Sequence, residues 1–320
     1  MRPGLRVGSL YLKATFRVGA GGRLQLDDAA PHPIYAGDVD TALGRIPADI
    51  TPRDTSDLDV VVLACAYAPG GRPVETMHVS LGLGDATSDL VVTGDRVWVG
   101  EGPSAQPTTP LSFTCMPLTW SNAYGGTAEI PFDMHDLSAR LPVRHAGNPE
   151  GKGFNPWCFV DATLITEDVR KTAAVTRRLP NIEDARDRVA RWSDDPLPAG
   201  WGALPPMWEA HALASGRHPS RGRALASHAA LPSLRIEPLR PNDRVELRGC
   251  TPDGSWGFAW PALCASFDYE LGQRQGTMEL RPLLLVLLPD ESRFTVTYRA
   301  QFRFDRPDPS ELRSLRVRVS

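Results

Sequence analysis

The sequence predicts a mainly β protein, either an antiparallel β-sandwich or a partly closed barrel, with long Gly/Pro-rich loops and few short helices. Two observations lead to this class. Several short segments alternate apolar and polar residues with the period of two that is typical of half-buried strands. The 320 residues also include 28 glycines and 30 prolines, which favour turns and interrupt helices. A helical bundle is therefore disfavoured.

The N-terminal part is expected to contain two hairpins. Residues 13–18 and 23–26 flank a glycine-rich turn, and residues 90–92 and 96–99 flank the sequence Thr-Gly-Asp. Strand-forming residues on both sides of a short turn sequence are the usual signal of a hairpin.

One short helix is expected after Asn181. An asparagine is a good helix N-cap, because its side chain can accept a hydrogen bond from a backbone N–H of the first turn. The helix would end before Pro196. The apolar residues expected on its buried face are Ile182, Ala185, Val189 and Trp192.

The C-terminal part predicts a hairpin and a run of long strands. Residues 244–248 and 256–260 flank a Thr-Pro-Asp-Gly turn. The continuous apolar run 283–288 is typical of a strand buried on both faces. After a turn, residues 295–304 alternate, so that Val296, Tyr298 and Ala300 face the core and the residues between them face outward. Residues 315–319 alternate again and predict a last strand.

Three regions follow from this pattern. Residues 1–105 form an N-terminal β region, 106–240 a loop-rich region and 241–320 a C-terminal antiparallel β region, and the three could build one composite domain. Two stretches have the composition of connectors, 101–110 and the Arg- and His-containing segment 216–232. The basic segment is interpreted as a solvated loop, or else as a surface for an acidic protein or for self-association.

Composition narrows the class of partner and the compartment. The net charge of −3 argues against nucleic acid and anionic membranes. The longest apolar run is far shorter than a membrane span, and the first residues do not have the pattern of a signal peptide. A cytoplasmic protein is expected, whose widely spaced cysteines are isolated thiols packed as small hydrophobes. The cysteines are Cys65, Cys115, Cys158, Cys250 and Cys264.

No established catalytic motif is present, so an enzyme is not expected and no cofactor is predicted. The alternative function is a metal-assisted hydrolase, in which His135 and Asp136 act with His145, close to Asp133. Histidine and aspartate at this proximity can bind a metal or pair as a base and the group that orients it.

Five tryptophans lie in the second half of the chain. They either fill the core beneath long loops, or some of them form an exposed apolar patch that binds a partner. Trp201 and Trp208 are the candidates for such a patch. The five are Trp192, Trp201, Trp208, Trp256 and Trp260.

Three segments have unusual and specific sequences: 117–126 with its Ala-Tyr-Gly-Gly end, 148–154 with Asn-Pro-Glu-Gly-Lys-Gly-Phe, and 179–184 with Leu-Pro-Asn-Ile-Glu-Asp. We call them the signature segments. Their glycines allow backbone conformations that other residues avoid, and their prolines fix φ beside them. Each is predicted to be a shaped loop pinned to the core.

In this order, the signature segments resemble those of a bacterial family of domains of unknown function that is found beside type VI secretion effector genes. The resemblance departs from the family at 210–234, which here is rich in Ala, Arg and His. Other segments similar to the family are 11–16, 57–62, 66–69, 92–98, 277–280, 287–290 and 294–302.

The resemblance implies an adaptor or chaperone that binds a cognate secreted effector and helps to load it onto a VgrG-type spike protein. The partner-binding candidates are Tyr124, Gly125, Gly126, Asn148, Gly151, Gly153, Phe154, Asn181, Glu183, Trp201 and Trp208. Because Gly, Pro and Asn also shape turns, the same residues have a structural interpretation.

Overall fold

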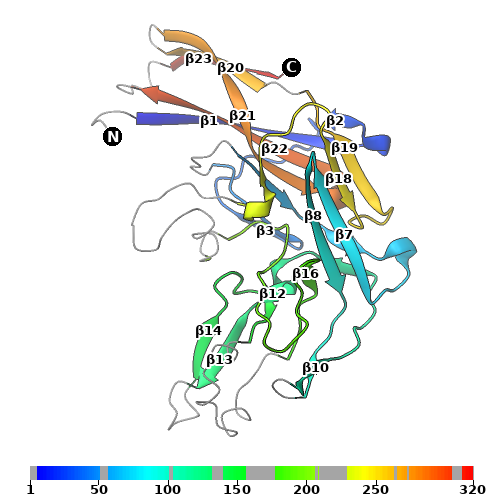
Figure 1. Cartoon of the computed structure of the whole chain (residues 1–320). Coiled ribbons are helices and arrows are strands. Elements are labelled where there is room, and N and C mark those ends of the chain that lie inside the picture. The colour runs from blue at the N-terminus through cyan, green and yellow to red at the C-terminus, as the bar shows by residue number, and fades with distance from the viewer. Residues whose placement is uncertain are drawn as a thin grey trace.

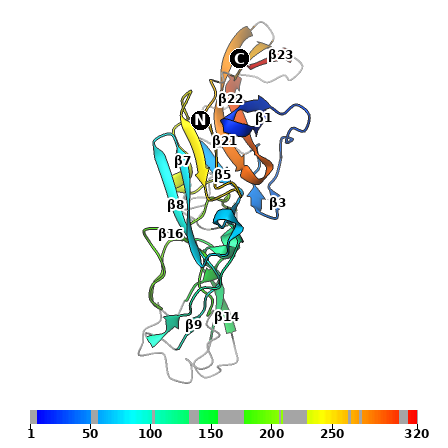
Figure 2. The same cartoon turned by 90° about the vertical axis from the view of Figure 1, so that its right-hand side faces the viewer.

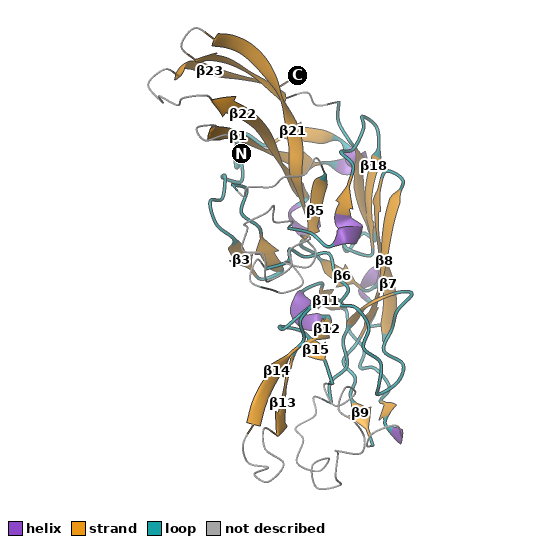
Figure 3. Cartoon of the chain, turned by 60° about the vertical axis from the view of Figure 1, so that its left-hand side comes forward, coloured by secondary structure: helices purple, strands orange, loops and turns teal. Residues whose placement is uncertain are grey.

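The chain folds as two packed antiparallel-type sheets with long loops, in a computed structural model. Figures 1 and 3 show an elongated molecule, with β20 and β23 near one end, the packed sheets in the middle and β13 and β14 near the other end. The structure describes residues 6–50, 57–100, 104–131, 140–155, 177–205, 208, 229–262, 265–271, 274–304 and 312–319.

The first sheet contains the longest of the described strands. All neighbours in it are antiparallel except β5 and β21, which run parallel. Beyond the packed region, β21 also pairs with β20 (Ala265–Leu271), and β20 pairs with β23 (Leu312–Val319). The main strand order of the first sheet is β17 (Arg235–Ile236), β5 (Leu58–Val62), β21 (Arg274–Leu288), β22 (Arg293–Phe304), β1 (Arg6–Val18) and β2 (Leu24–Leu26).

The second sheet is antiparallel throughout. It combines strands from all parts of the chain in the order β16 (Ile182–Asp184), β8 (Ala86–Thr93), β7 (Thr76–Leu83), β18 (Arg244–Arg248) and β19 (Ser255–Ala259). Each sheet therefore mixes strands from the N- and C-terminal regions. The expected mainly β architecture, with short helices only, is confirmed, and no closed barrel forms among the described strands.

Short pairs and turns complete the described elements. The pairs are β3 (Val39–Thr41) with β4 (Gly44–Ile46), β6 (Cys65–Tyr67) with β11 (Cys115–Pro117), β9 (Trp98–Val99) with β10 (Gln106–Pro107), β12 (Tyr124–Gly125) with β15 (Lys152–Gly153), and β13 (Thr127–Pro131) with β14 (Arg140–Arg144). The described 3-10 turns are η1 (Ala20–Gly22), η2 (Pro69–Gly71), η4 (Trp120–Asn122), η8 (Pro232–Leu234) and η9 (Pro289–Glu291).

The main core lies between the two sheets, which Figure 2 shows side by side with β7 and β8 on one side and β21 and β1 on the other. Phe258 of β19 stacks on Phe294 of β22 with ring centroids 4.2 Å apart, which joins the sheets across this core. Other inward residues are Val79, Leu81, Val245, Leu247, Leu285, Leu287 and Val296.

The run 283–288 is buried on both faces, as its sequence predicts. Leu285 and Leu287 face the main core, whereas Leu284 and Val286 belong to a second apolar cluster on the outer face of the sheet. The hairpins 13–26 and 244–260 are also confirmed, as β1–β2 and β18–β19.

Three local expectations are wrong. The helix after Asn181 does not form, because Ile182–Asp184 instead pairs with β8 as strand β16. The hairpin within 90–99 does not form either, because β8 pairs with β7 and β16 while Trp98–Val99 pairs with Gln106–Pro107. Finally, the outward face of 295–304 is not solvated near its start: Thr295 and Thr297 are buried.

Thr297 is buried because the segment 27–50 covers the outer face of β1 and β22. Its hydroxyl donates to the buried Asp49 carboxylate, which also forms an ion pair with Lys13 at 2.9 Å. A strand pattern tells which residues prefer water, and here a loop supplies polar partners in place of water. In the part of the chain that the structure describes, no helix has the length and apolar character of a membrane span.

Candidate functional site

The signature segments meet at one place beside the second sheet. Strand β12 runs parallel to β15, with Tyr124 opposite Lys152 and Gly125 opposite Gly153. The N–H of Asn181 donates to the carbonyl of Asn122 at 2.8 Å, and β16 continues into the ladder with β8. Three loops that are distant in sequence thus share one hydrogen-bonded network, which we call the signature cluster.

Gly125 is required by close backbone approach. Its φ is +135°, and a Cβ there would lie 2.2 Å from the carbonyl oxygen of Asn148. Gly151 is equally confined, since a Cβ would lie 2.6 Å from the carbonyl oxygen of Ala123. These glycines let two signature segments pack backbone against backbone.

Two buried asparagines clamp the cluster. Asn148 donates from Nδ2 to the carbonyls of Trp120 (2.8 Å) and Tyr124 (2.9 Å), and its Oδ1 accepts from the N–H of Glu150 (3.2 Å). Asn181 donates from Nδ2 to the carbonyl of Thr93 at 2.8 Å. Both side chains thus satisfy backbone groups that have no water around them.

Glu183 also acts inside the cluster. Its carboxylate is buried, binds the Arg96 guanidinium, and accepts a hydrogen bond from the N–H of Val189 at 2.7 Å. Burial lowers the pKa of Arg96, and the Glu183 charge opposes this shift. This paired carboxylate fixes the chain after β16 as a loop, which explains why the expected helix is absent.

His145 lies at the centre of an aromatic group. Its ring is edge-on to Tyr124 and Phe154, with centroids 5.4 and 5.1 Å away. Its Nδ1 accepts from the N–H of Asn148 at 3.1 Å, and its Nε2 lies 3.7 Å from the Asp195 carboxylate. An accepting Nδ1 requires the neutral ring. Burial lowers the pKa of His145, while Asp195 opposes the shift.

The metal-assisted alternative depends on residues that are only partly described. His135 and Asp136 lie outside the described residues, and so does Asp133. Within the described ranges, no three His, Cys, Asp or Glu side chains are arranged to hold a metal ion. His145 itself is engaged in holding Asn148.

His145 predicts a pH dependence of stability. Because its folded pKa is below the unfolded value of 6.5, the unfolded state takes up the proton first, and stability falls as the pH drops below about 6.5. The contribution of this group reaches at most about 1.4 kcal/mol per pH unit.

His145→Asn keeps an acceptor near the Nδ1 position without titrating, so urea unfolding as a function of pH should show a smaller loss of stability at acid pH. The exposed His78→Asn on β7 is the control and should follow the wild type. Equal acid losses in wild type and His145→Asn would contradict the assignment.

The tryptophan candidates lie in the core. Trp201 is fully buried and donates from Nε1 to the Ser88 hydroxyl at 2.9 Å, and Trp208 packs edge-on against Trp120. Trp256 and Trp260 are buried as well. The core interpretation therefore holds for these four, and Trp192 is half-buried.

All the partner-binding candidates that the sequence indicates are thus enclosed, fully or partly, by the rest of the protein. Gly151 and Gly153 are half-buried and the other nine are buried. The signature segments are hydrogen-bonded to one another, and this network fixes the conformation of the surrounding loops. Their side chains offer little surface of their own to a partner.

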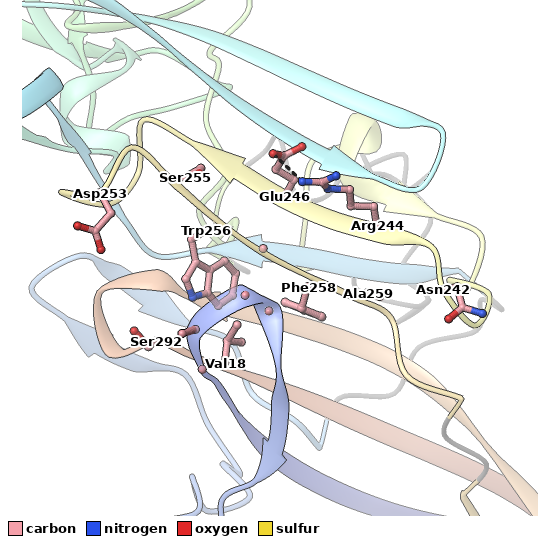
Figure 4. Close-up of a pocket in the computed structure, with 15 residues that line it drawn as sticks. Val18, Asn242, Arg244, Glu246, Asp253, Ser255, Trp256, Phe258, Ala259 and Ser292 are labelled. Carbon is pink, nitrogen blue, oxygen red and sulfur yellow. Dashed lines mark hydrogen bonds and ion pairs between the residues drawn. The ribbon is translucent and has the colours of Figure 1, made fainter.

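A groove of about 840 Å³ lies at the other end of the second sheet, between η1 and the β18–β19 hairpin (Figure 4). Trp256 and Phe258 of β19 point into the core, and the outer face of this strand carries only Ser255, Gly257 and Ala259. The outer face of β19 is therefore nearly bare backbone, while Trp256 and Phe258 also border the groove.

Charged side chains of β18 form one wall of the groove. Arg244 contacts Glu246 at 3.3 Å, the pair joined by a dashed line in Figure 4. Arg248 contacts the same carboxylate at 3.2 Å, and this hydrogen bond lowers the pKa of Glu246. Of these three side chains, Arg244 and Glu246 line the groove, so the wall presents one guanidinium group and one carboxylate to an incoming ligand.

Strand β19 is the open edge of its sheet. Backbone groups of alternate residues point to opposite sides of a strand. Since the N–H of Trp260 donates toward β18, to the Asp243 carbonyl at 2.7 Å, those of Ser255, Gly257 and Ala259 point outward. No described residue makes a backbone hydrogen bond to them from that side.

Turn η1 partly covers this edge. Gly22 approaches so closely that a Cβ on it would lie 2.8 Å from the carbonyl oxygen of Gly257. The turn has no buried residue, so little apolar surface holds it in place. The sequence predicts this strand but not its position at the edge of the sheet. The small residues that alternate with its aromatic residues were the one sequence signal that its outer face is nearly free of side chains.

The sequence model of one protein family, described as an uncharacterized protein conserved in bacteria (DUF2169), matches residues 4–299. The match includes strands of both sheets, the signature cluster and the groove. No curated protein and no solved structure matches the chain.

Proposed function

This chain belongs to the bacterial DUF2169 family, and on that premise we propose that it is a cytoplasmic adaptor, without catalytic activity, that binds a type VI secretion effector and helps to load it onto a VgrG-type spike. The nature of the partner comes from the resemblance of the signature segments. The observation that carries a binding role is the open β19 edge with its groove.

The edge suits an extended polypeptide segment. An added strand would pair with the outward N–H and C=O groups of Ser255, Gly257 and Ala259. The small outward side chains of β19 leave room for those of the segment, and Arg244 and Glu246, which line the groove, can select charge.

Turn η1 acts in this proposal as a replaceable cover. An unpaired edge attracts wrong partners, and proteins commonly protect such edges. A glycine turn that buries no side chain protects Gly257 while the site is empty, and an incoming segment displaces it at small energetic cost.

Co-purification tests the proposal. The tagged protein is expressed with the effector and spike proteins encoded beside it, and the retained proteins are identified. We expect the wild type to retain an effector or a spike protein. Retention of neither would contradict the adaptor role.

Two substitutions at one position locate the contact. Ala259→Pro removes an N–H that points outward, so the ladder to β18 stays intact. Ala259→Val keeps that N–H. With one or two hydrogen bonds lost, we expect Ala259→Pro to bind about tenfold more weakly, while Ala259→Val binds like the wild type. Equal binding by both variants would place the contact elsewhere on the molecule.

A further inference from the structure

Three cysteines that are far apart in sequence meet beside the main core. Cys65 lies in β6 and Cys115 in β11, and among the described strands these two pair with each other only. The N–H of Tyr67 donates to the carbonyl of Gly249 at 2.8 Å, which brings the chain beside Cys250 close to β6. The sequence predicts isolated thiols, and for Cys65 and Cys115, which lie on paired strands, that expectation is wrong.

The register places Cys65 and Cys115 on one face of the two-stranded sheet. Cys65 is opposite Pro117 and Cys115 is opposite Tyr67, so the two cysteines are diagonal neighbours. Cys115 also contributes to the raised pKa of the Cys65 thiol. Cys65 is buried, whereas Cys115 is exposed. Cys115 is thus accessible to solvent, and Cys65 lies diagonally across from it on the same face.

From this arrangement we propose that Cys65 and Cys115 form a reversible disulfide by exchange with a small disulfide such as oxidised glutathione. The exposed Cys115 thiolate attacks the small disulfide, which gives a mixed disulfide and releases one glutathione thiolate. The Cys65 thiol then loses its proton, attacks the Cys115 sulfur and releases the second glutathione. The protein pair is oxidised by two electrons, and the small disulfide is reduced to two thiols.

The strand geometry makes this bond labile. Diagonal neighbours are farther apart than the cysteines of a relaxed disulfide, so β11 must shift toward β6. Because β11 is three residues long and β6 is its one partner among the strands that the structure describes, the shift is local. Strained or exposed disulfides are the ones that are easily reduced again.

The second step is slow at neutral pH. Burial raises the pKa of the Cys65 thiol to about 12, with further contributions from Cys115 and from Asp290. Only the thiolate attacks. For a purified Cys115–glutathione adduct, we expect the rate of closure to rise about tenfold per pH unit, until the pH approaches that pKa.

Mass spectrometry of the full chain tests the proposal. The protein is incubated with oxidised glutathione, alkylated and digested with trypsin, which cleaves between the two cysteines after Arg96. The expected product joins the Cys65 and Cys115 peptides, and reducing agent separates them. An unmodified Cys115, or a stable glutathione adduct on it at alkaline pH, would overturn the proposal.

Two variants sharpen the result. In Cys65→Ala, the reaction should stop at the mixed disulfide, so that Cys115 keeps one glutathione. In Cys250→Ala, the Cys65–Cys115 crosslink should form as in the wild type. A crosslink that requires Cys250 instead of Cys115 would refute the assigned pair. The readout is peptide mass, so partial destabilisation of a variant does not obscure it.

Discussion

Gly125→Ala is expected to lower the free energy of unfolding by about 3–5 kcal/mol, a loss large enough to leave little folded protein. The φ of +135° is closed to residues with a Cβ, and the added atom would lie 2.2 Å from the Asn148 carbonyl oxygen. Both partners are backbone, so no side chain can move aside. Urea unfolding, followed by far-UV circular dichroism, measures the change.

Gly70→Ala is the matched control. Gly70 in η2 has a φ of +60°, but a Cβ there would meet nothing within 4 Å. Only left-handed strain remains, about 1–2 kcal/mol. Equal losses for the two variants would mean that strain alone, and not the contact between signature segments, makes Gly125 necessary.

Asp49→Ala is expected to destabilise the protein by about 3–5 kcal/mol, because it leaves a buried ammonium without its counter-charge. Lys13 and Asp49 are in contact at 2.9 Å with side chains 1% and 0% exposed. Asp49 also accepts hydrogen bonds from Thr297 and from the N–H of Tyr35. The Lys13 Nζ lies 4.2 Å from the Tyr35 ring centroid.

The expected loss of stability in Asp49→Ala comes from the burial of its ion pair, and a solvent-exposed ion pair serves as the control for this. Burial lowers the pKa of Lys13, and Asp49 opposes the shift. Arg45 and Asp40 are also in close contact, at 2.7 Å, yet the Asp40 side chain is 78% exposed. Asp40→Ala should therefore lose less than about 1 kcal/mol. Guanidinium-induced unfolding of both variants measures the difference, and a small loss for Asp49→Ala would show that water reaches Lys13.

Much of the local structure could be predicted, because local turn chemistry and periodicity specify it. The run 283–288 is apolar at every position, and such a strand must be buried on both faces. The glycine turn at 19–22 and the Thr-Pro-Asp-Gly turn at 251–254 can only reverse the chain, so the β1–β2 and β18–β19 hairpins follow.

Elements with an ambiguous pattern could not be predicted. Ile182, Ala185 and Val189 recur with helical spacing, but the hydrogen bonds offered by the edge of β8 and the buried Glu183 outweigh that weak preference. Residues 295–304 alternate, but the segment 27–50 covers the start of this strand and buries its polar side chains Thr295 and Thr297.

The sequence by itself determined that the chain is a β protein and that the signature segments are shaped loops, because glycine, proline and alternating apolar residues act on the backbone next to them. Only the tertiary structure decided that those segments interlock, that β19 lies at an open edge and that Cys65 meets Cys115. Periodicity tells which side of a strand is buried. Which strand becomes its neighbour depends on hydrogen bonds and packing between segments far apart in the chain.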